Sequence, residues 1–168
     1  MPGHALVKMT DLRAAFEAAG CEDMRSYIQS GNIVFEASDS QTLEHVRGQV
    51  NALIGGPAHV LFRTLQELDA IVATRPLDAF TADPKLKLYV AFLTEAPSRP
   101  VALPVVDTKE LLEIIAVQGK EAYLVSRRKP NGMYGFPNNL VEKVLGVPAT
   151  TRNWNTVTKL LAFVRDGR

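Results

Sequence analysis

The sequence contains very little cysteine, histidine or tryptophan. Its 168 residues include one cysteine, three histidines and one tryptophan. The lone cysteine, Cys21, excludes an internal disulfide and a cluster of thiolate metal ligands. His4, His45 and His59 lie far apart without the spacing of metal ligands, so we expect no metal site and no cofactor. The sequence also lacks a nucleophile elbow, a Walker loop and a dinucleotide-binding fingerprint.

Long apolar runs are missing as well. No segment approaches the roughly 20 apolar residues that a membrane span needs, and no charged-then-apolar leader begins the chain. We therefore expect a cytoplasmic protein that does not bind membranes. Hydrophobic residues make up 46% of the chain and charged residues 22%, which is ordinary for a globular protein. The length allows one large domain or two small ones.

Charge is unevenly distributed, although the formal net charge is only +1. Residues 1–118 carry 10 Lys+Arg and 15 Asp+Glu, a net charge of −5, whereas residues 119–168 carry 9 and 3, a net charge of +6. Such asymmetry favours an anionic partner for the C-terminal part, and it equally fits a solvated basic face.

Hydrophobic periodicity predicts an α+β chain. Prolines and polar residues between 75 and 84 are typical of a linker, which divides the chain into residues 1–74 and 85–168. The helix pattern covers residues 9–19, 43–54, 65–72, 135–145 and 153–164, and the strand pattern covers residues 24–29, 32–36, 58–64, 86–93, 112–117, 122–125 and 150–152.

The element order indicates two ferredoxin-like halves, which have antiparallel sheets with helices on one face. The first half reads α-β-β-α-β, so one preceding strand would complete a β-α-β-β-α-β unit. The second half repeats the plan, and we interpret the two as a tandem duplication.

Residues 149–159 concentrate specific polar chemistry around Trp154. The stripe of Val157, Leu161 and their apolar neighbours predicts a helix that starts near residues 153–155, with an asparagine as its N-cap. A helix start offers free backbone N–H groups and a partial positive charge to an anion. We expect the following residues to bind such an anion: Arg152, Asn153, Asn155, Thr156 and Lys159. The alternative is structural: the asparagines only cap the helix and Trp154 packs on the core.

Two further segments are candidates. In Y-I-Q-S-G-N, Tyr27 and Gln29 share one strand face, so they and Asn32 could meet a ligand or an RNA base. The alternative is that the segment only bends a strand. Segment 126–132 is a basic turn in which Arg127 and Arg128 could hold phosphates, or it is a solvated hairpin end.

Three stretches resemble a known family: K-M-T-D-L-R at residues 8–13, Y-I-Q-S-G-N-I-V-F at residues 27–35 and A-T-T-R-N-W-N-T-V at residues 149–157. They are similar to the bacterial family called domain of unknown function 1697. The resemblance implies a small cytoplasmic protein of two related halves and no known activity. The family usually begins with a β-strand. In this chain only the end of that strand remains, at residues 2–4. We therefore expect the first strand of the first half to be absent, and either an upstream start or strand pairing with a neighbouring chain.

The leading interpretation is a non-enzymatic binding module for an anionic ligand, either nucleic acid or a phosphorylated metabolite. One alternative is an enzyme for a small phosphorylated substrate, in which Arg152 and Lys159 hold charge and Tyr27 or a carboxylate moves a proton. Another is a homo-oligomer that pairs through an exposed strand edge.

Overall fold

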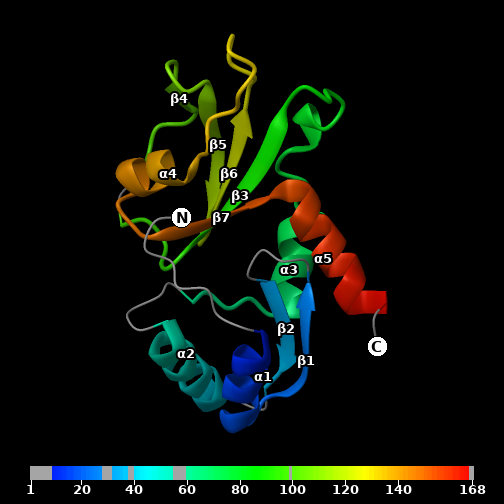
Figure 1. The fold of residues 1–168 in the computed structure, drawn as a ribbon. Coiled ribbons are helices and arrows are strands. Elements are labelled where there is room, and N and C mark those ends of the chain that lie inside the picture. The colour runs from blue at the N-terminus through cyan, green and yellow to red at the C-terminus, as the bar shows by residue number, and fades with distance from the viewer. Residues whose placement is uncertain (1–8, 28–31, 38–39, 55–59, 99, 167–168) are drawn as a thin grey trace. The chain divides into compact units, whose positions relative to one another are not determined.

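The computed structural model describes residues 9–27, 32–37, 40–54, 60–98 and 100–166 (Figure 1). The chain divides into two compact units, residues 1–62 and residues 63–168. The described residues form five α-helices, one short 3-10 helix and seven strands. The predicted α+β class is therefore confirmed.

The first unit pairs two helices with a hairpin. Strands β1 and β2 are antiparallel, and Tyr27 lies opposite Asn32. The helices α1 and α2 pack against each other. The bounds are α1 Met9–Ala18, β1 Glu22–Tyr27, β2 Asn32–Glu36 and α2 Ser40–Ile54.

Aromatic side chains organise the core of the first unit. The ring of Phe35 meets Phe16 at 5.0 Å and Phe62 at 6.0 Å between ring centres, both edge to face, which is a favoured geometry for aromatic pairs. Val46 and Val50 of α2 are buried in the same cluster.

The strand expected at residues 58–64 is not found in its described part. Residues 60–64 belong to no strand. Two of these residues contact side chains instead: the carbonyl of Val60 accepts from Arg47, and Phe62 packs on Phe35 and under the Arg47 guanidinium. The described part of this unit therefore has a two-stranded sheet, and the ferredoxin-like duplication is not confirmed.

The second unit is built on a five-stranded antiparallel sheet with the strand order β4-β5-β6-β3-β7. The helix α5 follows β7 directly, and α3 packs against α5. The bounds are α3 Leu65–Ala73, a 3-10 helix Asp78–Phe80, β3 Lys87–Leu93, β4 Val105–Asp107, β5 Leu112–Gln118, β6 Glu121–Ser126, α4 Asn138–Leu145, β7 Ala149–Asn153 and α5 Trp154–Asp166.

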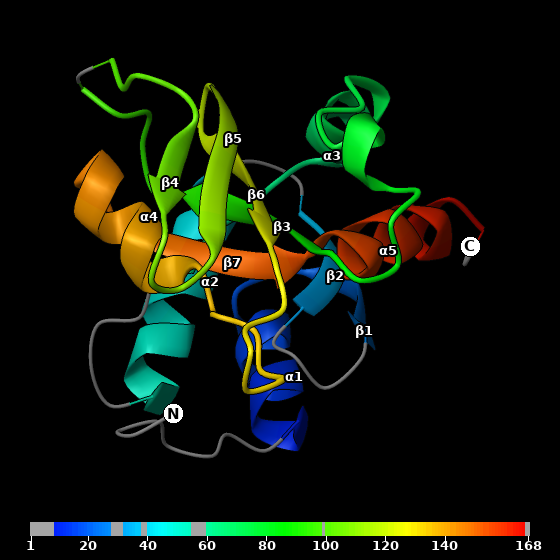
Figure 2. The same cartoon turned by 90° about the horizontal axis from the view of Figure 1, so that it is seen from above.

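Four of these strands follow the strand order of a ferredoxin-like sheet. Without β4, the order β7-β3-β6-β5 is the 4-1-3-2 arrangement of a ferredoxin-like unit. The connection from β3 to β5 carries the short edge strand β4, and its described residues contain no helix (Figure 2). Pro97, Pro100 and Pro104 lie in this connection, and proline disfavours a helix interior because it lacks the N–H donor.

The two faces of this sheet bury different partners. On one face Ala91, Leu93 and Leu124 pack with Val141 and Leu145 of α4. Side chains alternate along a strand, so the intervening residues point to the other face. There Tyr123 meets Trp154, the first residue of α5, with ring centres 6.1 Å apart.

Helix caps set the ends of α3 and α4. Thr64 and Glu67 form a reciprocal capping box at the start of α3, which satisfies two backbone donors. Gly146 ends α4 in the left-handed conformation, as expected for a helix stop. The expected linker at residues 75–84 lies inside the second unit, after α3.

Candidate functional site

The candidate site begins where β6 ends at Ser126. Ser126 lies opposite Lys87 at the start of β3, so Arg127, the next residue, comes close to Lys87 at the same end of the sheet. We call residues 127–136 the basic loop. Within it the amide of Lys129 donates to the carbonyl of Met133, and the amide of Gly132 donates back to Lys129, both at 2.8 Å.

Gly132 makes room for an arginine. It adopts a φ of +85°, a conformation that glycine tolerates best. A Cβ at this position would sit 3.3 Å from Nη2 of Arg128. The Arg128 side chain therefore lies along the turn instead of extending freely, while the residue itself is exposed.

The basic loop is fastened to the sheet at several points. The buried hydroxyl of Ser126 donates to the carbonyl of Gly135 at 3.1 Å. The Tyr134 hydroxyl donates to the carbonyl of Lys85 at 2.6 Å, and the Lys129 ammonium pairs with Glu110 at 2.8 Å. These bonds hold the loop in one geometry, which lowers the entropy lost when a ligand binds.

Cations and exposed apolar groups lie together on this end of the sheet. Phe136 is 63% exposed and Met133 is 64% exposed. The ring of Phe136 stands edge to face on Tyr89, and the Lys87 ammonium lies 4.5 Å from the centre of the Tyr134 ring. We define the basic surface as the exposed residues Lys85, Lys87, Arg127, Arg128, Met133 and Phe136.

Acidic residues neutralise part of the loop. Glu110 pairs with Lys129, and Glu113 lies 3.6 Å from the Arg127 guanidinium. The second pair is largely exposed and long, so it holds Arg127 only weakly. Among the residues that the structure describes, the side chains of Lys85, Lys87 and Arg128 form no ion pair with a carboxylate, and these three carry most of the positive charge of the basic surface.

The start of α5 reaches the same end of the sheet. Asn153, the last residue of β7, lies opposite Tyr89, and Tyr89 contacts Phe136 of the basic loop. The sheet thus brings together the two predicted segments that contain Arg127 and Asn153.

The residues of α5 divide into structural and exposed ones. The Asn153 side chain accepts from the amide of Asn155 at 2.9 Å, so Asn153 is the N-cap. Trp154 is buried, Thr156 is partly buried, and Asn155 and Lys159 are exposed on one helix face. The structural alternative therefore describes Asn153 and Trp154 well.

Arg152 is only partly accessible. It lies opposite Val90 in the sheet, and its guanidinium donates to the carbonyl of Thr151 at 3.2 Å. Burial lowers the pKa of Arg152 from its ordinary value, because removal from water disfavours the charged form. Its charge is thus less available to a ligand than that of Arg128.

The remaining candidates, Tyr27, Gln29 and Asn32, belong to the first unit. Tyr27 and Asn32 face each other across the β1–β2 hairpin. Gln29 lies outside the described residues, and the side chains of Tyr27 and Asn32 do as well. Their role stays a prediction.

Sequence reasoning missed Lys85, Lys87 and Phe136. The signal was available in part: Lys85 and Lys87 alternate immediately before an apolar strand, which puts both on the strand's exposed start. Phe136 sits next to Pro137 in a segment that the pattern assigned to a helix start, where an exposed aromatic ring is not apparent from periodicity.

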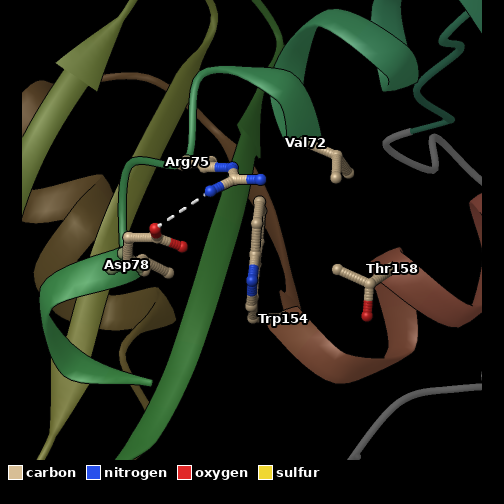
Figure 3. A pocket seen from close by; sticks show the side chains of 6 residues that line it. Val72, Arg75, Asp78, Trp154 and Thr158 are labelled. Atoms are coloured by element: carbon tan, nitrogen blue, oxygen red, sulfur yellow. Dashed lines mark ion pairs between the residues drawn. The ribbon is translucent and has the colours of Figure 1, made fainter. Parts of the chain in front are cut away.

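A pocket of about 370 Å³ lies beside Trp154 (Figure 3). Its walls come from the end of α3, the following turn and the first two turns of α5. Tyr123 supports Trp154 from the sheet; burial raises the pKa of the Tyr123 hydroxyl above its ordinary value, and the nearby Glu121 adds to the rise. The pocket is lined by Val72, Arg75, Leu77, Asp78, Trp154 and Thr158.

The residues that the structure describes contain no group of three or more His, Cys, Asp and Glu side chains arranged to hold a metal ion. None of their helices has both the length and the apolar character required to cross a bilayer.

The fold defines an α+β protein whose larger unit presents a basic, partly aromatic surface at one end of an antiparallel sheet. The chain belongs to the family described as protein of unknown function (DUF1697), whose profile matches residues 1–123. This confirms the resemblance; the match includes Y-I-Q-S-G-N and ends before the segment around Trp154. Comparison with curated proteins and with solved structures gave no match.

Proposed function

We propose that this protein is a non-enzymatic module that binds single-stranded nucleic acid through the basic surface. The observation that carries the proposal is the sheet register, which places Ser126 opposite Lys87 and so gathers cations from two strands beside the exposed ring of Phe136. Cations neutralise phosphates, and exposed aromatic rings stack on bases without regard to sequence.

Nucleic acid is favoured over a phosphorylated metabolite by the form of the surface. Lys85, Lys87 and Arg128 are exposed residues beside Phe136 and Met133. A small phosphate ester usually binds in a concave site, whereas a strand contacts an open surface with several phosphates and bases.

The test is binding of a labelled single-stranded oligonucleotide, measured by fluorescence anisotropy over a series of salt concentrations. The affinity should fall steeply with salt because bound phosphates release counterions. Lys87→Ala and Arg128→Ala should each reduce the slope of log K against log salt by about 0.7. Lys120→Ala is the matched control, because Lys120 is exposed at the opposite end of β6, in the β5–β6 turn.

Phe136→Ala separates stacking from charge. It should weaken binding by roughly 1–3 kcal/mol and leave the salt slope unchanged. If Lys120→Ala weakens binding as much as Lys87→Ala does, the attraction is general and the basic surface is not the site. If no oligonucleotide binds while inorganic phosphate raises the melting temperature, the ligand is a phosphorylated metabolite.

The start of α5 provides a second arm of the same test. Asn155, Lys159 and the partly buried Arg152 were predicted to bind phosphate with the helix N-terminus. Lys159→Ala and Asn155→Ala leave the Asn153 cap in place, so the fold should survive both. If both variants keep full affinity while Lys87→Ala loses it, the site is confined to the basic surface.

A further inference from the structure

The pocket beside Trp154 has a mixed lining that the proposed function does not use. Arg75 supplies a guanidinium at its mouth and Asp78 a carboxylate, while Val72 and Leu77 are apolar. Figure 3 shows Arg75 and Asp78 on one side of the indole and Val72 and Thr158 on the other. The pocket thus combines an aromatic ring with one donor group and one acceptor group.

The backbone at Arg75 is unusual. Arg75 adopts a φ of +50° directly after the C-cap of α3. Glycine is the usual residue in the left-handed position that ends a helix, and another residue there carries a strain that the surrounding structure must support. Here the conformation aims a long cationic side chain at the pocket, which glycine would not provide.

The polar groups at the pocket mouth are weakly tied to each other. The Arg75 guanidinium and the Asp78 carboxylate are 3.7 Å apart, and their side chains are 75% and 61% exposed. An exposed pair of this length contributes little, so a ligand can take over both partners at small cost. Thr158 lies one turn beyond Trp154 in α5, and its hydroxyl donates to the carbonyl of Asn155, which leaves its oxygen able to accept.

We infer that the pocket binds a guanine-type ring that touches the exposed edge of the largely buried Trp154, with its N–H edge toward Asp78 and its carbonyl and N7 edge toward Arg75. Guanine offers both kinds of partner: acceptors at O6 and N7, which arginine recognises, and donors on its Watson–Crick edge, which a carboxylate accepts. Adenine presents no carbonyl to the guanidinium, and cytosine is smaller and lacks N7. The volume of about 370 Å³ lies within the usual range of small-ligand pockets.

This inference does not rest on the proposed function, because a nucleoside carries no phosphate for the basic surface to hold. The probes are therefore guanosine, adenosine and cytidine. Trp154 is the only tryptophan, so its intrinsic fluorescence reports contact between its exposed edge and a bound ring directly. Guanosine should quench this emission saturably, and adenosine and cytidine should bind at least ten-fold more weakly.

Variants locate the site. Asp78→Asn should weaken guanosine binding at least ten-fold, since an amide cannot accept from both N–H groups of the ring. Arg75→Gly should also weaken it, and at the same time raise the melting temperature, because glycine relieves the left-handed strain. A collapse of the fold cannot produce this combination. Lys87→Ala is the control and should keep full affinity for guanosine.

Three results would overturn the inference: no saturable quenching by guanosine, equal quenching by all three nucleosides, or unchanged affinity in both Asp78→Asn and Arg75→Gly. Failure of guanosine binding with intact oligonucleotide binding overturns only the pocket. Loss of oligonucleotide binding in Lys87→Ala with intact guanosine binding shows that the two sites are separate.

Discussion

The basic loop leads from β6 to α4, and the start of α5 follows β7 directly. Both segments carry cations and an aromatic residue. In the basic loop Arg128 and Phe136 are exposed. Trp154, the first residue of α5, is buried against Tyr123, and Arg152 of β7 is partly buried in the sheet. The same residue types therefore serve a surface in one segment and anchor a helix in the other.

The difference arises from the place of each aromatic residue relative to the sheet. Trp154 follows β7 directly and turns toward the face that Tyr123 occupies. Phe136 comes after a loop held at Ser126 and Gly135, and its ring makes an edge contact with Tyr89 of the sheet. A density of polar and aromatic residues is thus not by itself a sign of a binding site.

The two aromatic residues should respond very differently to truncation. Trp154→Ala removes a buried ring and leaves a cavity, so it should lower the free energy of unfolding by about 3–5 kcal/mol. Phe136→Ala removes a ring that is 63% exposed and should change stability far less. Denaturant titration followed by circular dichroism measures both free energies of unfolding. Equal losses of stability would contradict the distinction between a buried, stabilising Trp154 and an exposed Phe136.

Two ion pairs extend the comparison to charge. Arg63 and Glu121 are 2.8 Å apart with side chains only 10% and 15% exposed, and Arg63 also reaches the carbonyl of Lys120. Arg63→Ala leaves Glu121 in a buried place without this partner and should cost about 3 kcal/mol or more.

Arg127→Ala is the matched exposed case. The Arg127–Glu113 pair is 3.6 Å long with side chains 49% and 24% exposed, so its loss should cost between about 0 and 1 kcal/mol. Chemical denaturation of both variants tests the contrast. A loss at Arg127 as large as that at Arg63 would mean that the basic loop is held by its charges and not by its hydrogen bonds.

Alkaline pH should lower the stability of the protein through Tyr123, which packs against Trp154. The folded-state pKa of Tyr123 is raised above its ordinary value of 10.0, mainly by burial. Its contribution to stability is therefore complete below pH 10 and is lost as pH rises through the folded-state pKa. Tyr123→Phe should lower stability slightly below pH 10 and flatten the decline above it. Denaturant midpoints measured on both sides of pH 10 decide the matter, and an unchanged alkaline decline would show that other groups cause it.

Much of the second unit could be predicted from the sequence. The strand pattern at residues 86–93, which is apolar from Leu88 onward, indicated the central strand β3, and Gly119 with Lys120 is the kind of pair that turns the chain between β5 and β6. These elements carry strong local signals: period, turn residues and caps. Prolines at 97, 100 and 104 are typical of a loop, but the edge strand β4 that follows them has only three residues and no local pattern.

The first unit and the site were less predictable, for a different reason. Residues 60–64 have the composition of a strand, yet Val60 and Phe62 are engaged by Arg47 and Phe35. Such tertiary contacts override propensity. In the site, Arg127 and Arg128 were identified because they are adjacent in sequence, whereas Lys87 joins them only through the pairing of β3 with β6, which one sequence does not reveal.

The smallest expected effect concerns Arg75, the residue in the left-handed conformation that lines the pocket with Trp154. Arg75→Gly removes an exposed, weak ion pair with Asp78 and relieves a left-handed backbone, so stability should rise by up to about 1 kcal/mol. Arg75→Asn is the matched variant, because asparagine tolerates this conformation better than arginine but still carries a Cβ; its gain should be smaller than that of glycine. Precise thermal denaturation of the three proteins orders them, with glycine highest and arginine lowest. If arginine is the most stable of the three, the left-handed conformation is not strained, and the argument that Arg75 is kept there for its side chain fails.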